Sequence, residues 1–191
     1  MRHIISVLVE NEFGVLAKVS GLFSGRGFNI ESLCVAETTD PTVSRITLVT
    51  SGDDRVLAQV TKHLEKLVNV IRVGDFSSSG HVERELVLVK VRAEARSRGD
   101  VLSVINIFRG KVVDVGASSY VVEATGSQEK IQAFLRLLEP FGVLEVARTG
   151  VVALYRGEEV LRATIEEPPD LDVGGDHEGR IRREGSSADF V

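Results

Sequence analysis

The chain has 191 residues, 43% of them hydrophobic, which is enough for one large or two small globular domains with their own cores. A single cysteine, Cys34, excludes a disulfide framework or a cysteine metal site within the chain, and we expect it to be a buried small apolar residue. No run approaches the roughly 18 apolar residues that a membrane span needs, and the N-terminus lacks a signal-peptide layout, so we expect a soluble, cytoplasmic protein.

The formal net charge of −5 is unevenly distributed along the chain. Ten of the 28 acidic residues but only four of the 23 Lys and Arg residues follow Gly157, so the preceding part is close to neutral. The sequence shows no basic run with interleaved aromatic residues. This pattern argues against nucleic acid as a partner.

The first 76 residues alternate between strand-like and helix-like hydrophobic patterns. Runs rich in β-branched and apolar residues predict strands at residues 4–9, 30–38, 43–51 and 68–76. Apolar stripes at helical spacing predict helices around residues 16–23 and 57–67. The order β-α-β-β-α-β is that of a ferredoxin-like domain, in which two helices cover one face of a four-stranded sheet.

The second half repeats this order of elements. Strands are predicted at residues 86–91, 112–115, 120–124, 144–147 and 151–155, and helices at 101–108 and 131–138. The small polar run Ser77–Gly80 is typical of a flexible linker. The sequence therefore predicts an α+β protein with two ferredoxin-like βαββαβ domains, at residues 1–77 and 83–157, joined by a linker at 78–82.

The pattern changes after Gly157, where acidic residues combine with Pro and Gly and few apolar residues remain. We predict a disordered acidic tail over residues 158–191, because such a segment buries too little apolar surface to fold. A short helix over residues 159–165 would be marginal on its own.

No residue pattern predicts a catalytic or metal site. The four histidines lack metal-ligand spacing and are expected at exposed positions. A solvated strand start explains Glu83 and Glu85, and a helix N-terminus explains Asp53 and Asp54. The glycine-rich run at residues 21–27 lacks the Lys-Ser ending of a phosphate-binding loop, and helix termination explains it.

The turn Asn11–Gly14, between the first strand and the first helix, combines several requirements of a site for a small zwitterion. The first helical turn offers unpaired backbone N–H groups and the positive end of the helix dipole, which suit a carboxylate. Gly14 lets a ligand approach the backbone, and Asn11 and Asn29 offer amide donors and carbonyl oxygens. We expect these two asparagines to lie close together. The alternative is that all three are ordinary loop and helix-start residues.

Seven runs of residues resemble a known family in order and spacing: Glu10–Leu16, Arg26–Leu33, Ser44–Thr47, Lys66–Val70, Val82–Leu86, Phe108–Val115 and Ala147–Ala153. The family is the small, regulatory subunit of acetolactate synthase (acetohydroxyacid synthase). The resemblance covers about residues 1–157 and implies an N-terminal ACT domain followed by a C-terminal regulatory-subunit domain. Phe13 differs from the proline or serine expected there.

The resemblance implies a non-catalytic protein that binds and stimulates the catalytic (large) subunit and confers feedback inhibition by valine, in valine, leucine and isoleucine biosynthesis. Thiamine diphosphate, magnesium and FAD would belong to the catalytic subunit, and this chain would hold no cofactor. The ACT domains of the family pair as a homodimer with the effector at their interface. By position, the residues that would contact valine are Asn11, Gly14, Val15, Leu16, Asn29 and Ile30.

Homodimerisation is also expected on physical grounds, because a sheet with helices on one face leaves strand edges and an open face that partners can cover. We expect the open faces to meet other subunits. Two other functions stay open: a stand-alone amino-acid sensor controlling another enzyme or a transcription factor, and a small enzyme on the same scaffold.

Overall fold

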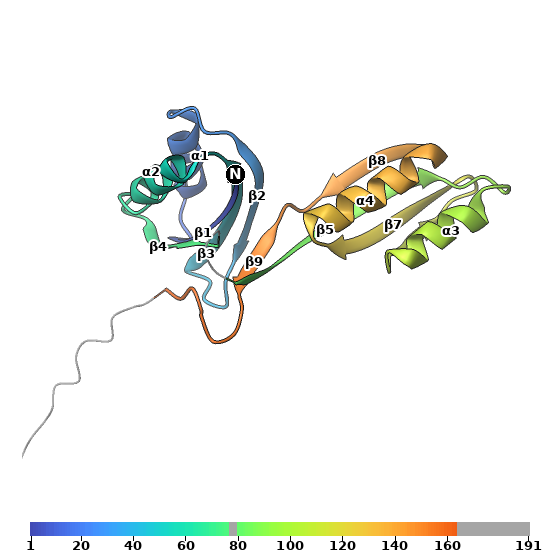
Figure 1. Cartoon of the computed structure of the whole chain (residues 1–191). Helices are drawn as coiled ribbons and strands as arrows, with labels where there is room; N and C mark the ends of the chain where they lie inside the picture. The colour runs from blue at the N-terminus through green and yellow to red at the C-terminus, as the bar shows by residue number, and fades with distance from the viewer. Residues whose placement is uncertain (77–79, 164–191) are drawn as a thin grey trace, which may run out of the picture.

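The computed structural model describes residues 1–76 and 80–163, which form two α+β domains joined by a pair of strands (Figure 1). Residues 77–79, which include the start of the predicted linker, and the predicted tail from residue 164 onward lie outside the described residues. The N-terminal domain has the predicted order of elements: β1 (Arg2–Glu10), α1 (Val15–Ser24), β2 (Ile30–Glu37), β3 (Val43–Ser51), α2 (Asp54–Leu64) and β4 (Val70–Asp75). Its antiparallel sheet has the order β2-β3-β1-β4, which makes β2 and β4 its edges.

Strand β1 is buried on both faces, as its nearly continuous apolar pattern predicts. On one face, Ile5 and Val7 pack against Val19 and Phe23 of α1 in the core beneath the two helices. The four-residue spacing of these α1 residues places them on one side of the helix. The alternate residues of β1 point to the opposite face of the sheet, which the helices do not cover.

The C-terminal domain is a second ferredoxin-like unit. It comprises β5 (His81–Arg92), α3 (Arg98–Ile107), β6 (Lys111–Val115), β7 (Ser119–Gly126), α4 (Gln128–Leu138), the short 3-10 helix η1 (Glu139–Phe141) and β8 (Val143–Arg148). The strand order is β6-β7-β5-β8. Alternate residues of β5 and β7 meet the apolar sides of α3 and α4 in a separate core. Ser127 caps α4 through its side chain, which accepts from the Lys130 N–H.

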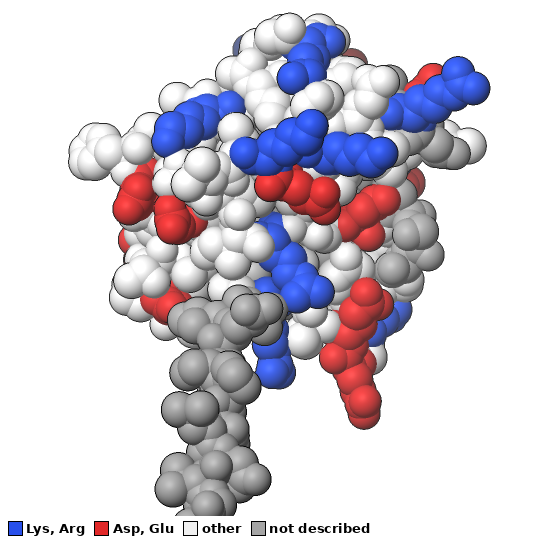
Figure 2. Space-filling view, turned by 90° about the vertical axis from the view of Figure 1, so that its left-hand side faces the viewer, with Lys and Arg blue, Asp and Glu red and all other residues white. Residues whose placement is uncertain are grey.

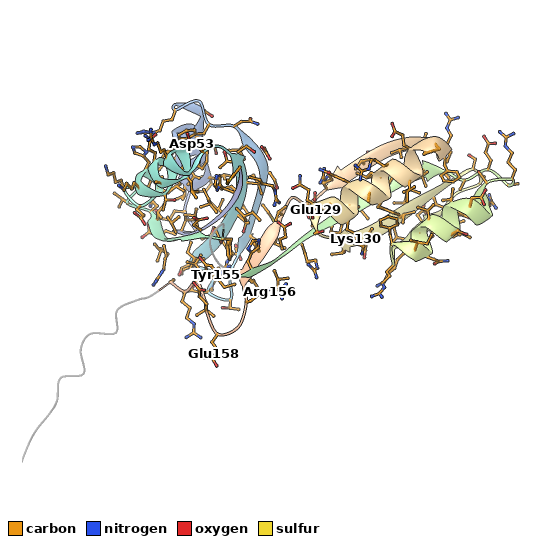
Figure 3. The ribbon with its side chains drawn as sticks, viewed as in Figure 1. Asp53, Glu129, Lys130, Tyr155, Arg156 and Glu158 are labelled. Carbon is orange, nitrogen blue, oxygen red and sulfur yellow. The ribbon has the colours of Figure 1, made fainter. Side chains whose placement is uncertain are left out.

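Strand β5 takes part in two sheets. Its first residues, His81–Arg84, pair with β9 (Val152–Tyr155) in a two-stranded ribbon, whereas its later residues lie in the C-terminal sheet. The predicted linker at 78–82 is therefore wrong for residues 81 and 82. Arg156 closes the ribbon, because its backbone N–H donates to the Gly80 carbonyl at 2.9 Å and its Nε to the His81 carbonyl at 3.0 Å (Figure 3).

The ribbon covers part of the open face of the N-terminal sheet. Val151 and Ala153, each 4% exposed, join Ile4 and Phe76 in a small core on this face. The ring of Tyr155 lies 4.3 Å from that of Phe76, centroid to centroid. The expectation that this face is left for other subunits is corrected: the chain covers part of it with residues that follow its second domain.

A further segment of the chain continues along the same face. Leu161 is 9% exposed and packs with Leu8 and Val43. Nη2 of Arg45 donates to the Leu161 carbonyl at 3.1 Å. Residues 158–163, predicted to belong to a disordered tail, are thus anchored to the sheet. They do not form the short helix considered for this segment, as far as the described residues extend.

Candidate functional site

The Asn11–Gly14 turn presents the start of α1 to solvent. Gly14 is the N-cap residue and has φ +80°, a left-handed conformation that favours glycine. No side chain caps the helix, and a Cβ at Gly14 would meet no atom within 4 Å. The side chain of Phe13 is fully exposed. The Val15 N–H donates to the Glu12 carbonyl at 3.5 Å, so the helix start offers an outside acceptor the N–H groups of the residues that follow in its first turn, in an open space.

Asn11 is held by the loop between β2 and β3. Its Nδ2 donates to Oε1 of Glu37 at 3.1 Å and to the Pro41 carbonyl at 2.9 Å, and its backbone N–H donates to the Thr42 carbonyl at 2.7 Å. Both side-chain bonds use the amide hydrogens, so the Oδ1 atom is what Asn11 can offer to a ligand. Asp40 orders the same loop: hydrogen bonds from Thr42 lower the pKa of its carboxyl group.

Asn69 stabilises the other side of the turn, a role that no local sequence pattern indicates. It is 8% exposed and its Oδ1 accepts from Nζ of Lys18 at 2.6 Å. Its Nδ2 donates to Oε2 of Glu10 at 2.7 Å and to Oε2 of Glu12 at 3.3 Å. One buried amide thus links α1 to the last residue of β1 and to Glu12 within the turn. Only its place within the family-like run 66–70 could have drawn attention to it.

Asn29 lies at the opposite end of the sheet from Asn11. The register pairs Glu10 with Val43 and Ile30 with Thr50, so Asn11 adjoins the first residue of β3 and Asn29 adjoins its end. Seven residue steps along β3 separate Val43 from Thr50, roughly 23 Å at 3.3 Å per residue. The expected proximity of the two asparagines is therefore wrong within one chain.

The remaining predicted contact residues differ in accessibility. Val15 is 3% exposed and Ile30 packs against the core beneath the helices, so neither has a fully open side chain. Leu16 is 41% exposed and lies on the open side of α1. Within one copy, the structure brings together the backbone of Gly14 and the side chains of Asn11 and Leu16.

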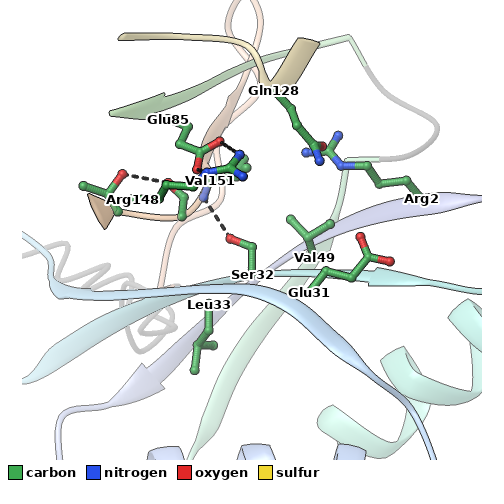
Figure 4. A pocket seen from close by; sticks show the side chains of 11 residues that line it. Arg2, Glu31, Ser32, Leu33, Val49, Glu85, Gln128, Arg148 and Val151 are labelled. Carbon is green, nitrogen blue, oxygen red and sulfur yellow. Dashed lines mark hydrogen bonds and ion pairs between the residues drawn. The ribbon is translucent and has the colours of Figure 1, made fainter. Parts of the chain in front are cut away.

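A cavity of about 250 Å³ lies between the two domains (Figure 4). On one wall, Nη2 of Arg148 donates to Oε2 of Glu85 at 2.7 Å. Hydrogen bonding to the Glu85 side chain raises the pKa of the Arg148 guanidinium. On the other wall, Oγ of Ser32 accepts from the Val151 N–H at 3.0 Å. Gly150 stands so close to Ser32 that a Cβ would lie 2.7 Å from its Oγ. The Ser32–Val151 hydrogen bond and the close approach of Gly150 to Ser32 join the domains, whereas the Arg148–Glu85 pair lies within the C-terminal sheet.

Three predictions about single residues are corrected. Glu85, interpreted as part of a solvated strand start, is 3% exposed, and His3, expected at the surface, is 2% exposed with its Nε2 3.1 Å from the Gly52 carbonyl oxygen. Cys34, expected to be buried, is half-buried. Glu85 is paired with Arg148 of β8 and His3 lies against Gly52 beyond the end of β3, whereas Cys34 lies on the edge strand β2, and the sequence pattern shows none of these long-range placements.

The described residues contain no group of three or more His, Cys, Asp or Glu placed to hold a metal ion. Over the same residues, no helix is long and apolar enough to cross a membrane. Figure 2 shows Lys and Arg side chains interspersed with Asp and Glu over the N-terminal domain.

The N-terminal βαββαβ unit, with its glycine-capped first helix, is of the ACT class, and a family model described as the AHAS small subunit-like ACT domain matches residues 5–72. A second model, described as the small subunit of acetolactate synthase, matches residues 84–157. The chain belongs to the acetolactate synthase small-subunit family, whose members are regulatory subunits.

Individual relatives agree with this assignment. The acetolactate synthase small subunit of Mycolicibacterium smegmatis is 52% identical over 155 residues, covering 81% of this chain and 91% of the relative. The isozyme 3 small subunit of Escherichia coli is 50% identical over 163 residues, covering 85% and 100%. The crystal structure of the small subunit from Thermotoga maritima is 40% identical with a TM-score of 0.77, covering 83% of this chain and 99% of that one.

Proposed function

We propose that the chain binds a catalytic subunit of acetolactate synthase, raises its activity and makes it sensitive to valine, which binds between the N-terminal domains of two copies. Membership of the small-subunit family supports the partner. Thiamine diphosphate, magnesium and FAD would be held by the catalytic subunit, and this chain would act without a cofactor. Its place would be in the biosynthesis of branched-chain amino acids, in the cytoplasm.

The position of Asn29 is the observation that carries the shared site. Strand β2 is a sheet edge, and edge strands can pair with another chain. If β2 pairs antiparallel with β2 of a second copy, the Asn29 end of one strand comes beside the Glu37 end of the other. Glu37 is hydrogen-bonded to Asn11 at 3.1 Å. Two asparagines that are far apart in one chain would then flank one site.

The groups at this site would match the parts of an amino acid. The valine carboxylate would accept from the N–H groups at Gly14 and the first turn of α1, aided by the helix dipole. Its ammonium group would donate to the Oδ1 atoms of Asn11 and of Asn29 from the second copy. Leu16 and Ile30 would border the isopropyl group, with Val15 contributing backbone.

Inhibition would require that valine bind more tightly to the inhibited arrangement of the complex than to the active one. A coupling free energy of roughly 1–3 kcal/mol corresponds to a 5- to 150-fold difference in affinity. The effector site lies between two copies, so a change in how these copies pair is a direct route from valine binding to the catalytic subunit.

The test is an assay of the catalytic subunit with and without this chain, titrated with valine and, in parallel, with leucine and isoleucine. We expect stimulation by wild type and its loss as valine is added. Gly14→Asp should weaken valine binding at least tenfold while stimulation persists, because its carboxylate would repel that of valine. Gly14→Asn is the matched control, since asparagine shares the tolerance for positive φ but carries no charge. Unchanged valine binding by Gly14→Asp, measured by calorimetry, would refute the placement of the site.

A further inference from the structure

A second cavity, of about 520 Å³, lies beside the ribbon, at the open face of the N-terminal sheet. One wall comes from strands β2 and β3 and the loop between them, and the other from β5 and β9. Its lining residues are Cys34, Ala36, Glu37, Thr38, Thr39, Arg45, Thr47, Val82, Arg84, Val152, Ala153 and Leu154. The volume lies within the range of small-molecule sites.

Arg45 is a half-buried cation in this wall. Its Nη2 donates to the Leu161 carbonyl at 3.1 Å, but its Nη1 is buried and has no hydrogen-bond partner among the described residues. No carboxylate of residues 1–76 or 80–163 forms an ion pair with it. Loss of hydration lowers the pKa of its guanidinium. A cation removed from water without a counter-ion is unfavourable, and an anion would relieve this.

The other groups of the cavity define what kind of anion fits. Val152 is 48% and Leu154 61% exposed, so apolar side chains face the opening. Arg84 adds a second guanidinium, while Glu37 is the single acidic residue in the lining and is already hydrogen-bonded to Asn11. The cavity therefore carries net positive charge next to apolar surface.

We propose that this cavity binds an apolar monocarboxylate, with its carboxylate at Arg45 and its hydrocarbon part against Val152 and Leu154. The site is separate from the proposed valine site, which uses the start of α1. Because the cavity has one wall from the N-terminal sheet and one from the ribbon, a bound carboxylate would favour the docked position of the ribbon. The ligand class follows from the combination of an unpaired guanidinium and an apolar wall.

Cys34 provides a direct readout, since it lines the cavity and is the only cysteine in the sequence. The experiment measures the rate of Cys34 alkylation by N-ethylmaleimide in the full chain, with increasing octanoate and, as a neutral counterpart, octan-1-ol. We expect octanoate to slow alkylation at least fivefold at saturation, and octanol to protect only at much higher concentration. Equal protection by both compounds, or none by either, would overturn the proposal.

Variants test whether octanoate protection depends on the positive charge at Arg45 or only on the shape of the cavity. Arg45→Met should weaken protection by octanoate at least tenfold, and Arg45→Lys should keep part of it. Arg55→Met, which removes an exposed arginine of α2 outside the cavity, is the matched control. Leu154→Glu changes an exposed position and should abolish protection by repelling the carboxylate, which keeps the test valid if Arg45→Met fails to fold.

All alkylation rates are compared at one protein concentration, because the pairing of β2 between two copies proposed above would itself change access to Cys34. Octanoate protection that survives both Arg45→Met and Leu154→Glu would overturn the proposal.

Discussion

Glu85 and Arg148 form an ion pair in which burial decides how much each partner contributes to the free energy of unfolding. The Glu85 side chain is 3% exposed, whereas that of Arg148 is 38% exposed. Both lie at the junction between the domains, where Arg2 also binds Glu83 at 3.0 Å. Because only the carboxylate is deeply buried, the two partners of this ion pair should not be equivalent.

We predict that Arg148→Met lowers the free energy of unfolding by about 2 kcal/mol, because it leaves the Glu85 carboxylate buried and unpaired. Glu85→Gln should cost about half as much, since the amide oxygen still accepts a hydrogen bond and Arg148 can hydrate. Urea denaturation of the two variants, at neutral pH, measures both values. Equal losses, or a larger loss for Glu85→Gln, would contradict this account.

At the scale of elements, the ribbon and the segment after it are what tie the C-terminal part of the chain to the N-terminal sheet. The ribbon contributes Val151 and Ala153 to one small core, and the following segment contributes Leu161 to another. Leu161 is an isolated anchor, because its neighbour Val160 is 52% exposed. Burial of one leucine side chain stabilises by roughly 1.5–3 kcal/mol.

Leu161→Asp should therefore lower the free energy of unfolding by about 2 kcal/mol, since it removes apolar burial and places a charge against Leu8 and Val43. Val160→Asp is the matched control, and we expect a change within about 0.5 kcal/mol. Thermal and urea unfolding of both variants would test the difference. Indistinguishable stabilities would show that the segment after β9 is not an anchor.

At the scale of the whole molecule, β5 and β9 make the two domains interdependent. The pairing of β5 with β9, the Val151–Ser32 hydrogen bond, the Arg2–Glu83 ion pair and the small core around Phe76 all contribute to the junction. The edge strand β2 stands beside this junction, since Ser32 is one of its residues. A second copy that pairs along β2 would therefore lie against both the proposed valine site and the junction between the domains.

Antiparallel β2 pairing about a two-fold axis predicts a specific cross-link. The two Cys34 residues, near the middle of β2, would lie within about 8 Å of each other. A short bismaleimide should therefore join two wild-type chains through their only cysteines, and Cys34→Ser should abolish the product. Val35→Pro, which removes a backbone donor from the edge strand, should reduce both the cross-link and the dimer seen by analytical ultracentrifugation. A stable dimer without cross-linking would exclude this pairing.

Most elements of the fold could be predicted because strand and helix periodicities are local. Alternation and continuous apolar runs marked β1 and β3, and apolar stripes marked α1 and α2, within a few residues of the observed bounds. The Asn11–Gly14 turn was recognisable for the same reason, since a glycine N-cap between a strand and a helix is a feature of neighbouring residues.

The sequence by itself determined two ferredoxin-like units, the family and the glycine-capped turn, because each depends on residue types at short spacing. Only the tertiary structure decided which surfaces those elements meet. Strand register placed Asn29 at the far end of the sheet from Asn11, and pairing of β5 with β9 turned part of a predicted linker into strand. An alternating segment has the same pattern whichever sheet it covers, and one apolar residue such as Leu161 gives no periodicity, so these long-range contacts have no local signature.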